Sequence, residues 1–305
     1  MKGAFEGGQM LKNDIVAVVV TYNRKVLLNK CIKSLKAQTY PLDILIIDNA
    51  STDGTADMFK KDMERTIYYN TGANIGGAGG FNVGIKIAAK LGYNYYWLMD
   101  DDTIPQIDSL EKLVWADRYL NGDYGFLASN VLWKDGSICI MNRQKYYNKI
   151  IIPNKYENTI IPVTQASFVS IFLNKKTVEE VGLPIKEFFI WGDDVEYTRR
   201  ISIINRCRSF MVKNSEVIHL MGENRGSNIS VDIPERIERY RYAFRNEFYT
   251  YQEAGIRGLA YYFAKCIFNL IRIMIKSPDY KTERAKILIK AVVAGSKFKP
   301  EIEKI

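Results

Sequence analysis

The feature that most constrains the fold of this chain is a regular alternation of apolar runs and polar loops in its first ~100 residues. Short apolar runs lie at 15–20, 44–47, 67–70 and 95–99, and stretches with helical apolar spacing separate them. Continuous apolar runs are typical of strands that are buried on both faces of a sheet. Because strand and helix signals alternate, we predict a parallel α/β sheet.

Polar or glycine-rich clusters follow each of these predicted strands, at 21–24, 48–53, 74–80 and 100–102. The carboxyl ends of parallel strands meet at one edge of a sheet, and ligands of such sheets bind there. The four loops together therefore predict a nucleotide site at this edge.

The middle of the chain contains shorter strand-like stretches, which we expect to extend the sheet in antiparallel fashion. They lie at 126–131, 138–141, 150–153 and 166–173, followed by a predicted helix over 193–205 and a strand over 215–219. From about residue 234, strand signals stop and helical patterns dominate. We divide the chain into a leader (1–13), an α/β domain (14–233) and a basic amphipathic helical region (234–305).

The formal net charge of the chain is +9, and most of it lies in the C-terminal part. Residues 240–305 contain 13 Lys/Arg and 6 Asp/Glu, a balance of +7. Such a surface favours an anionic partner, which is nucleic acid, anionic lipid or a phosphorylated substrate. Because no nucleic-acid-binding motif accompanies the charge, we expect no nucleic-acid partner.

Residues 257–276 have the spacing of an amphipathic helix with one roughly apolar face. Two interpretations are open: an interfacial helix on the anionic inner face of the cell membrane, or a helix packed on the α/β domain or a partner subunit. Lys265 and Arg272 interrupt the longest apolar run, so we expect no membrane-spanning helix. The pattern leaves open whether the chain forms a homo-oligomer.

Residues 1–12 lack the pattern of a signal peptide, and we expect a loose leader there. The four cysteines are scattered and form no C-x-x-C pair, which argues against a structural zinc site and for reduced thiols. We therefore expect a cytoplasmic protein that is peripheral on the inner face of the membrane.

Asp100, Asp101 and Asp102 follow the fourth predicted strand directly. Clustered carboxylates repel one another, so a strand end that carries three of them favours a bound cation. If the chain stays extended, Asp100 and Asp102 point the same way, and their oxygens suit Mg²⁺ or Mn²⁺. The alternative is a solvated acidic turn. His219, the only histidine, is either a nitrogen ligand of such a site or a structural residue.

A glycine-rich loop at 74–80 precedes a predicted helix over 81–91. Glycine lets the backbone approach a ligand closely, and a helix N-terminus favours negative charge. A tight turn is the alternative. The loop lacks the spacing of a dinucleotide fingerprint, and the chain contains no P-loop pattern.

Asp193 and Asp194 follow the aromatic segment 188–191. A carboxyl group beside apolar rings is harder to ionise, so its pKa rises toward the range that suits a general base. Trp191 and its neighbours can also stack on the face of a sugar. The alternative is that one of the two aspartates caps the predicted helix.

The chain resembles family 2 inverting glycosyltransferases of the GT-A fold in five motifs that occur in the same order. They are V-V-V-T-Y-N-R, I-I-D-N-A-S-T-D-G-T, N-I-G-G-A-G-G-F-N, W-L-M-D-D-D-T and W-G-D-D-V-E, and they lie within residues 15–219. The resemblance implies a Rossmann-like nucleotide-binding sheet with an antiparallel acceptor-side extension, followed here by a C-terminal helical region.

The resemblance also implies roles for particular residues. It places eight residues of the first three loops at the nucleotide-sugar donor: Thr21, Tyr22, Asn23, Arg24, Asp48, Asn74, Gly76 and Gly77. It makes Asp100, Asp102 and His219 ligands of Mn²⁺ or Mg²⁺, and it turns Asp101 and Trp191 toward the donor sugar. Asp194 matches the catalytic base, with Asp193 as the second choice.

The double-glycine form of the third motif is closest to galactofuranosyltransferases. We therefore expect inverting transfer of galactofuranose from UDP-galactofuranose to a lipid-linked cell-surface glycan. A dTDP-rhamnose-dependent rhamnosyltransferase is the alternative, because that branch shares much of the pattern. A sugar nucleotidyltransferase would carry an early G-x-G-T-R-like loop, which is absent near residues 20–24. A non-catalytic membrane scaffold is the remaining alternative.

Overall fold

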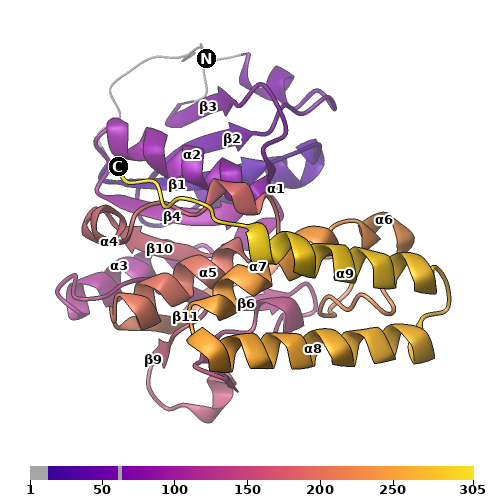
Figure 1. The fold of residues 1–305 in the computed structure, drawn as a ribbon. Coiled ribbons are helices and arrows are strands. Elements are labelled where there is room, and N and C mark those ends of the chain that lie inside the picture. The colour runs from indigo at the N-terminus through magenta and orange to yellow at the C-terminus, as the bar shows by residue number, and fades with distance from the viewer. Residues whose placement is uncertain (1–12, 61–63) are drawn as a thin grey trace.

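The computed structural model describes residues 13–60 and 64–305 and has a mixed sheet at its centre (Figure 1). The predicted leader over residues 1–12 lies outside this range. The strand order is β3-β2-β1-β4-β10-β6-β11-β5, and β9 pairs with β11. The strands are β1 (Ile15–Thr21), β2 (Asp43–Asp48), β3 (Thr66–Asn70), β4 (Tyr95–Asp100), β5 (Thr103–Pro105), β6 (Leu127–Trp133), β9 (Ile160–Val163), β10 (Ile171–Asn174) and β11 (Ser209–His219). A separate hairpin joins β7 (Lys145–Tyr146) and β8 (Lys149–Ile150).

The four N-terminal strands are parallel, as the alternation of the sequence predicts. All seven residues of β1 are buried, which explains its continuous apolar run. In the register of the sheet, Thr21 pairs with Asp48, and Val20 pairs with Asp100. The polar loops after these strands therefore do meet at one edge.

The second half of the sheet is mixed, whereas we expected an antiparallel extension. β10 is antiparallel to β4 and β6, but β11 runs parallel to β6. Two predicted strands are largely absent, since 138–141 and 150–153 contain the 3₁₀ turns η2 (Ile140–Asn142) and η3 (Pro153–Lys155). Pro153 has no N–H group to donate to a strand ladder. Between β2 and β3, where the sequence predicts helical spacing, the described residues form a 3₁₀ turn at Ala56–Phe59.

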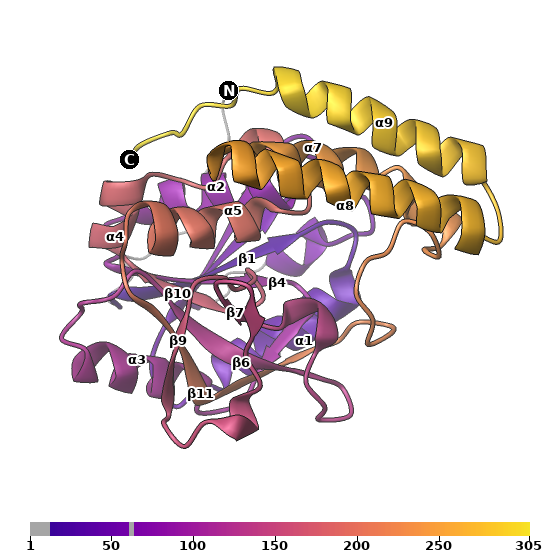
Figure 2. The same cartoon turned by 60° about the horizontal axis from the view of Figure 1, so that its bottom comes forward.

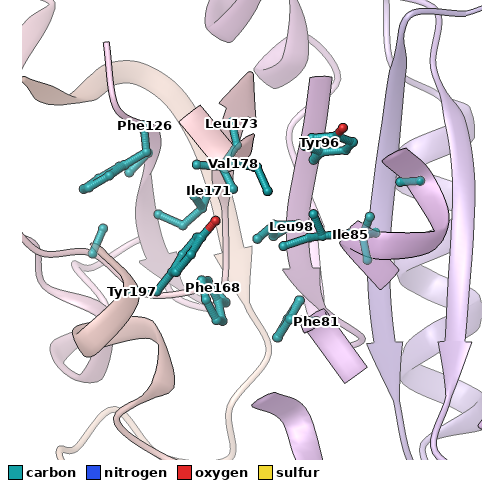
Figure 3. Close-up of a cluster of buried hydrophobic side chains, with 14 of the residues drawn as sticks. Phe81, Ile85, Tyr96, Leu98, Phe126, Phe168, Ile171, Leu173, Val178 and Tyr197 are labelled. Carbon is teal, nitrogen blue, oxygen red and sulfur yellow. The ribbon is translucent and has the colours of Figure 1, made fainter. Parts of the chain in front are cut away.

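Helices cover both faces of the sheet. α1 (Lys25–Lys36) and α3 (Ser109–Tyr119) pack on one face, and α2 (Gly76–Lys90), α4 (Lys175–Val181) and α5 (Asp193–Arg199) pack on the other. On the second face, Phe81 and Ile85 of α2 lie beside Leu98 of β4, and Phe168 and Tyr197 continue the same core (Figure 3). The expected helix over 193–205 is present as α5 continued by one π-helical turn.

Helix α2 begins at Gly76 rather than at Phe81, because its glycines are part of the helix. A Cβ atom on Gly80 would lie 2.5 Å from Val20 Cγ1, and one on Gly84 would lie 2.4 Å from Val18 Cγ1. These glycines therefore let α2 lie close against β1. Much of the glycine run serves this packing rather than a ligand.

The C-terminal helices are α6 (Pro234–Ile237), α7 (Tyr240–Gln252), α8 (Gly255–Lys276) and α9 (Lys281–Lys297). They share a core of their own, which includes Phe248, Tyr262 and Leu288. α8 and α9 lie side by side along α7, and the end of the chain returns to the α/β domain (Figures 1 and 2). There the N–H of Leu183 donates to the carbonyl of Glu303 at 2.8 Å.

Helix α8 is, by length and composition, apolar enough to cross a membrane, although Lys265 and Arg272 led us to expect no such helix. One of its faces is buried in the C-terminal core through Tyr262, Cys266 and Ile273. Length and composition alone do not distinguish a spanning helix from one that packs within a fold.

Candidate active site

A cleft of about 1550 Å³ lies where the strand-end loops meet α7 and α8. Thirteen of the fifteen residues that the sequence singles out line it: Thr21, Tyr22, Arg24, Asn74, Gly76, Gly77, Asp100, Asp101, Asp102, Trp191, Asp193, Asp194 and His219. The predicted metal group and the predicted base therefore share one cleft. Burial is the main cause of the raised pKa of Asp193 and of Asp194, and the charge of Asp100 adds to it.

The other two predicted donor residues, Asn23 and Asp48, do not line the cleft. Asn23 ties the first loop to the second, because its Oδ1 accepts a hydrogen bond from the N–H of Thr52 at 2.7 Å. Asp48 is buried and accepts a hydrogen bond from the Tyr68 hydroxyl at 2.6 Å. In this structure both side chains support the loops, and a direct role at the nucleoside stays a prediction.

Asn49 lines the cleft beside Asp48, and sequence reasoning missed it. Its Nδ2 donates to the carbonyl of Gly76 at 3.0 Å, which joins the second loop to the start of α2. Gly76 has a φ of +75°, and a Cβ there would lie 2.0 Å from the carbonyl oxygen of Phe189. The glycine loop therefore contacts the aromatic segment that precedes Asp193.

The first acidic group is built at the end of β4. Asp100, Asp102 and His219 each offer one ligand atom, and these atoms lie within 4.8 Å of one another. His219 comes from the end of β11, where it pairs with Thr103 of β5. Two carboxylates and one imidazole around a common point suit Mn²⁺, and the oxygens also suit Mg²⁺.

Two cations contact this acidic group. Arg24 Nη1 lies 2.6 Å from Asp102 Oδ2 and 3.5 Å from Asp101 Oδ1. His219 Nε2 lies 3.0 Å from Asp102 Oδ1, and its Nδ1 lies 2.8 Å from Asn142 Oδ1. Asn142, which the sequence did not single out, thereby orients the imidazole.

The protonation of this group follows from its surroundings. Burial, together with the charge of Asp102, raises the pKa of Asp100 to about 6. Burial also raises the pKa of Asp101 to about 7. Burial opposes ionisation of Asp102 as well, but the hydrogen bond from His219 and the charge of Arg24 lower its pKa. Despite burial, the hydrogen bond with Asp102 raises the pKa of His219 to about 10. The imidazole must lose this proton before it can bind a metal ion.

The second acidic group, Asp193 and Asp194, lies in the first turn of α5. Burial and the charge of Asp194 raise the pKa of Asp193 well above its usual range. Burial raises the pKa of Asp194 to about 6. Of the two carboxyl groups, Asp194 therefore ionises at the lower pH.

Neither aspartate caps α5 through its side chain, so the capping alternative is wrong for this helix. The N-cap residue is Gly192, and no side-chain cap hydrogen bond forms there. Asp194 Oδ1 instead accepts from the N–H of Val195 at 2.7 Å. The other carboxyl oxygens of Asp193 and Asp194 are therefore available to a ligand in the cleft.

The loop before this pair has an unusual backbone, since Phe189 and Trp191 both have φ of 63°. Such angles are costly for bulky residues and persist only where neighbours hold them. Asn246 of α7 holds them here. Its Nδ2 donates to the carbonyls of Phe188 at 3.0 Å, Ile190 at 3.3 Å and Trp191 at 2.7 Å. No motif in the sequence indicates this role for Asn246.

Comparison with known proteins shows the family of this chain. The family model for glycosyl transferase family 2 matches residues 16–172, slightly more than half of the chain. The chain belongs to glycosyl transferase family 2. This glycosyltransferase is 25% identical over 264 residues to galactofuranosyltransferase GlfT1 of Mycobacterium tuberculosis, a match that covers 82% of the chain and 86% of GlfT1.

A second relative of the glycosyltransferase is dTDP-rhamnosyl transferase RfbF of Shigella flexneri, 25% identical over 300 residues, which covers 93% of the chain and 96% of RfbF. Among solved structures, the mannosyltransferase PcManGT from Pyrobaculum calidifontis in complex with GDP-Man and Mn²⁺ superposes with a TM-score of 0.53 at 15% identity. That match covers 94% of the chain and 76% of PcManGT. The predicted GT-A-like α/β fold with C-terminal helices is thus confirmed.

Proposed function

We propose that this glycosyltransferase transfers galactofuranose from UDP-galactofuranose, with inversion, to a lipid-linked cell-surface glycan. The observation that carries the proposal is that a group of potential metal ligands and the carboxyl groups of Asp193 and Asp194 line one cleft. The likeness to GlfT1 supports galactofuranose as the sugar. The likeness to RfbF, which extends over almost its whole length, supports dTDP-rhamnose as the second candidate donor.

Asp100, Asp102 and His219 would hold a divalent ion, as the Mn²⁺ complex of PcManGT suggests. When bound, that ion supplies positive charge that offsets the charge of the nucleotide diphosphate leaving group. Thr21 keeps Asp101 in place, since its hydroxyl donates to Asp101 Oδ2 at 2.7 Å. We assign Tyr22, Asn49 and Asn74, which line the cleft beside this group, to the nucleoside and ribose.

Asp194 acts as the general base in this proposal. It takes the proton of an acceptor hydroxyl while that oxygen bonds to the anomeric carbon, and the bond from that carbon to the nucleotide diphosphate breaks on the opposite face. Burial raises the pKa of Asp193 further than that of Asp194, so Asp194 ionises first and is the better general base. Trp191 lines the cleft beside the pair and is placed to contact the donor sugar.

A donor screen tests this function. The protein is incubated with membrane lipid extract, Mn²⁺ and UDP-galactofuranose, UDP-galactopyranose, UDP-glucose or dTDP-rhamnose, and products are detected by mass spectrometry. We expect transfer from UDP-galactofuranose that EDTA and Asp102→Ala abolish. Tight UDP binding that neither treatment changes would contradict the metal role. Release of pyrophosphate from UTP and a sugar phosphate would indicate a nucleotidyltransferase instead.

We further propose that the protein is cytoplasmic and lies on the anionic inner face of the membrane through α8. Eight large apolar side chains on this helix are exposed: Ile256, Tyr261, Phe263, Ile267, Phe268, Ile271, Met274 and Ile275. Basic residues at both ends of α8, Arg257 and Lys276, suit anionic lipid.

Vesicle co-sedimentation tests this placement. The double variant Phe263→Glu/Ile267→Glu should lose binding to vesicles of anionic lipid. Tyr119→Glu, which alters an exposed aromatic residue on α3, serves as the control and should bind like the wild type. Equal binding of the wild type and the double variant would refute the role of α8.

A further inference from the structure

We propose that the cleft contains a second anion site, formed by Lys145, Arg199 and Lys265, that binds a phosphate or diphosphate group of the acceptor. This inference rests on the proposed glycosyl transfer and adds the chemical class of the acceptor. The three cations come from three different elements, β7, α5 and α8, and all line the same cleft as Asp194.

Helix α8 separates this site from the exposed apolar surface. Tyr261, Lys265, Phe268 and Arg272 recur at intervals of three and four residues, so they share one face, and all four line the cleft. The other six exposed apolar residues of α8 do not line the cleft. One helix thus presents two cations and two aromatic rings to the cleft, and its other exposed apolar side chains to the outside.

The positive charge of the site is not balanced by the protein. In the part of the chain that the structure describes, Lys145 and Arg199 form no ion pair, and Arg199 Nε is buried without a hydrogen-bond partner. Glu247 is already paired with Lys265, whose Nζ lies 2.6 Å from Glu247 Oε1. Glu253 interacts electrostatically with Arg199. Burial raises the pKa of Glu253 to about 7, so its carboxyl group is only partly ionised near neutral pH.

The positive charges of this site repel one another. Burial, followed by the charge of Lys265, lowers the pKa of Lys145, and Arg143 and Arg199 add to the effect. Buried cations that repel one another are stabilised by an anionic ligand. Phosphate oxygens match both the planar guanidinium of Arg199 and the point charges of the two lysines.

This site is distinct from the donor site. Arg24 contacts Asp101 and Asp102, the acidic group assigned to the donor diphosphate. The charges that act on Lys145 are instead those of Lys265, Glu247, Arg143 and Arg199. An anion bound among them belongs to the other substrate, the acceptor, whose hydroxyl must reach Asp194 in the same cleft.

Isothermal titration calorimetry on the full chain tests the site. EDTA is present so that no divalent ion contributes at the donor site, and the probes are geranyl diphosphate, geraniol and inorganic pyrophosphate. We expect geranyl diphosphate to bind and geraniol not to bind. Lys145→Gln and Arg199→Gln should each weaken binding of geranyl diphosphate about tenfold, because each removes a charge-assisted contact.

Lys149→Gln is the matched control, since Lys149 lies in the same hairpin as Lys145 but is exposed and does not line the cleft. It should bind geranyl diphosphate like the wild type. If pyrophosphate also binds and both cleft variants weaken its binding, the site is supported and recognises phosphate alone. If geranyl diphosphate binds more tightly than pyrophosphate, the site is supported and its ligand is a lipid-linked diphosphate.

Three results would overturn the inference: geraniol binds as tightly as geranyl diphosphate, both cleft variants bind like the wild type, or Lys149→Gln weakens binding equally. Melting temperatures show that the variants fold, and we expect no decrease for Lys145→Gln, because it relieves repulsion. UDP binding with Mn²⁺ should be unchanged in both cleft variants. The proposed function is tested independently of the anion site: it would be refuted if the wild type consumed no sugar nucleotide.

Discussion

The two acidic groups of the cleft differ in how their charge is balanced. Asp101 and Asp102 contact the guanidinium of Arg24, and Asp102 also contacts His219. Asp193 and Asp194 form no ion pair with any residue in 13–60 or 64–305, and burial raises the pKa of both. The first group is thus suited to exchange one cation for another, and the second is suited to hold and release protons.

The two groups also differ in what supports them. The first follows β4, a buried strand whose position is set by its pairing with β1. The second depends on a strained loop that Asn246, from the C-terminal helices, holds in place. Changes in the first group should therefore affect cation and nucleotide binding, and changes in the second should affect the chemical step.

The largest effect is expected from Asp194→Asn, which removes the base while it keeps the shape of the side chain. We expect kcat to fall about 10³-fold, within the range typical of general bases, with UDP binding unchanged. The measurement is turnover of sugar nucleotide with acceptor. Asp193→Asn is the matched control, and a similar loss for both variants would remove the distinction between the two aspartates.

A smaller effect is expected from Asp102→Asn, which weakens the partner of Arg24 and His219. Apparent Mn²⁺ affinity, measured from the activation of turnover, should fall roughly 100-fold. The control is Asp108→Asn, whose carboxylate forms an exposed pair with Lys112 at 2.8 Å. Unchanged Mn²⁺ activation in Asp102→Asn would refute the metal assignment.

Asn246→Asp tests whether the loop depends on the C-terminal helices. The substitution keeps the size of the side chain but removes the donors to three carbonyls. We expect unfolding free energy to fall by about 1–3 kcal/mol and kcat to fall more than the donor KM rises. Gln252→Ala, at an exposed position of α7, is the control. A normal kcat in a destabilised Asn246→Asp would mean that the loop needs no such support.

The smallest effect is a pH dependence. Because Asp194 must be ionised to act, its pKa of about 6 predicts that kcat rises with pH and levels off above about pH 6. Asp193→Asn should leave this midpoint near 6, since burial is the main cause of the shift. The free energy of unfolding changes with pH in the opposite direction to kcat. The contribution from the raised pKa of Asp194 is fully present below pH ~4 and is lost as pH rises through about 6. A flat rate profile from pH 5 to 8 would contradict the assignment of the base.

The parallel strands, the loops at their ends and both acidic groups can be predicted from the amino-acid sequence. These features depend on local apolar periodicity and on residues that are adjacent in the chain, such as Asp100 to Asp102. The middle strands were less predictable, because their pairing depends on partners far along the chain, such as Leu127 with Phe210.

The support and the charge of the side chains in the site depend instead on contacts between residues far apart in the chain. Asn246 lies 55 residues from the Trp191 carbonyl that it binds, and Asn142 lies 77 residues from His219. The sequence around neither asparagine predicts its hydrogen-bond partner. The protonation of Asp193 and the unbalanced charge around Lys145 likewise depend on burial and on neighbours from separate elements, which local sequence does not contain.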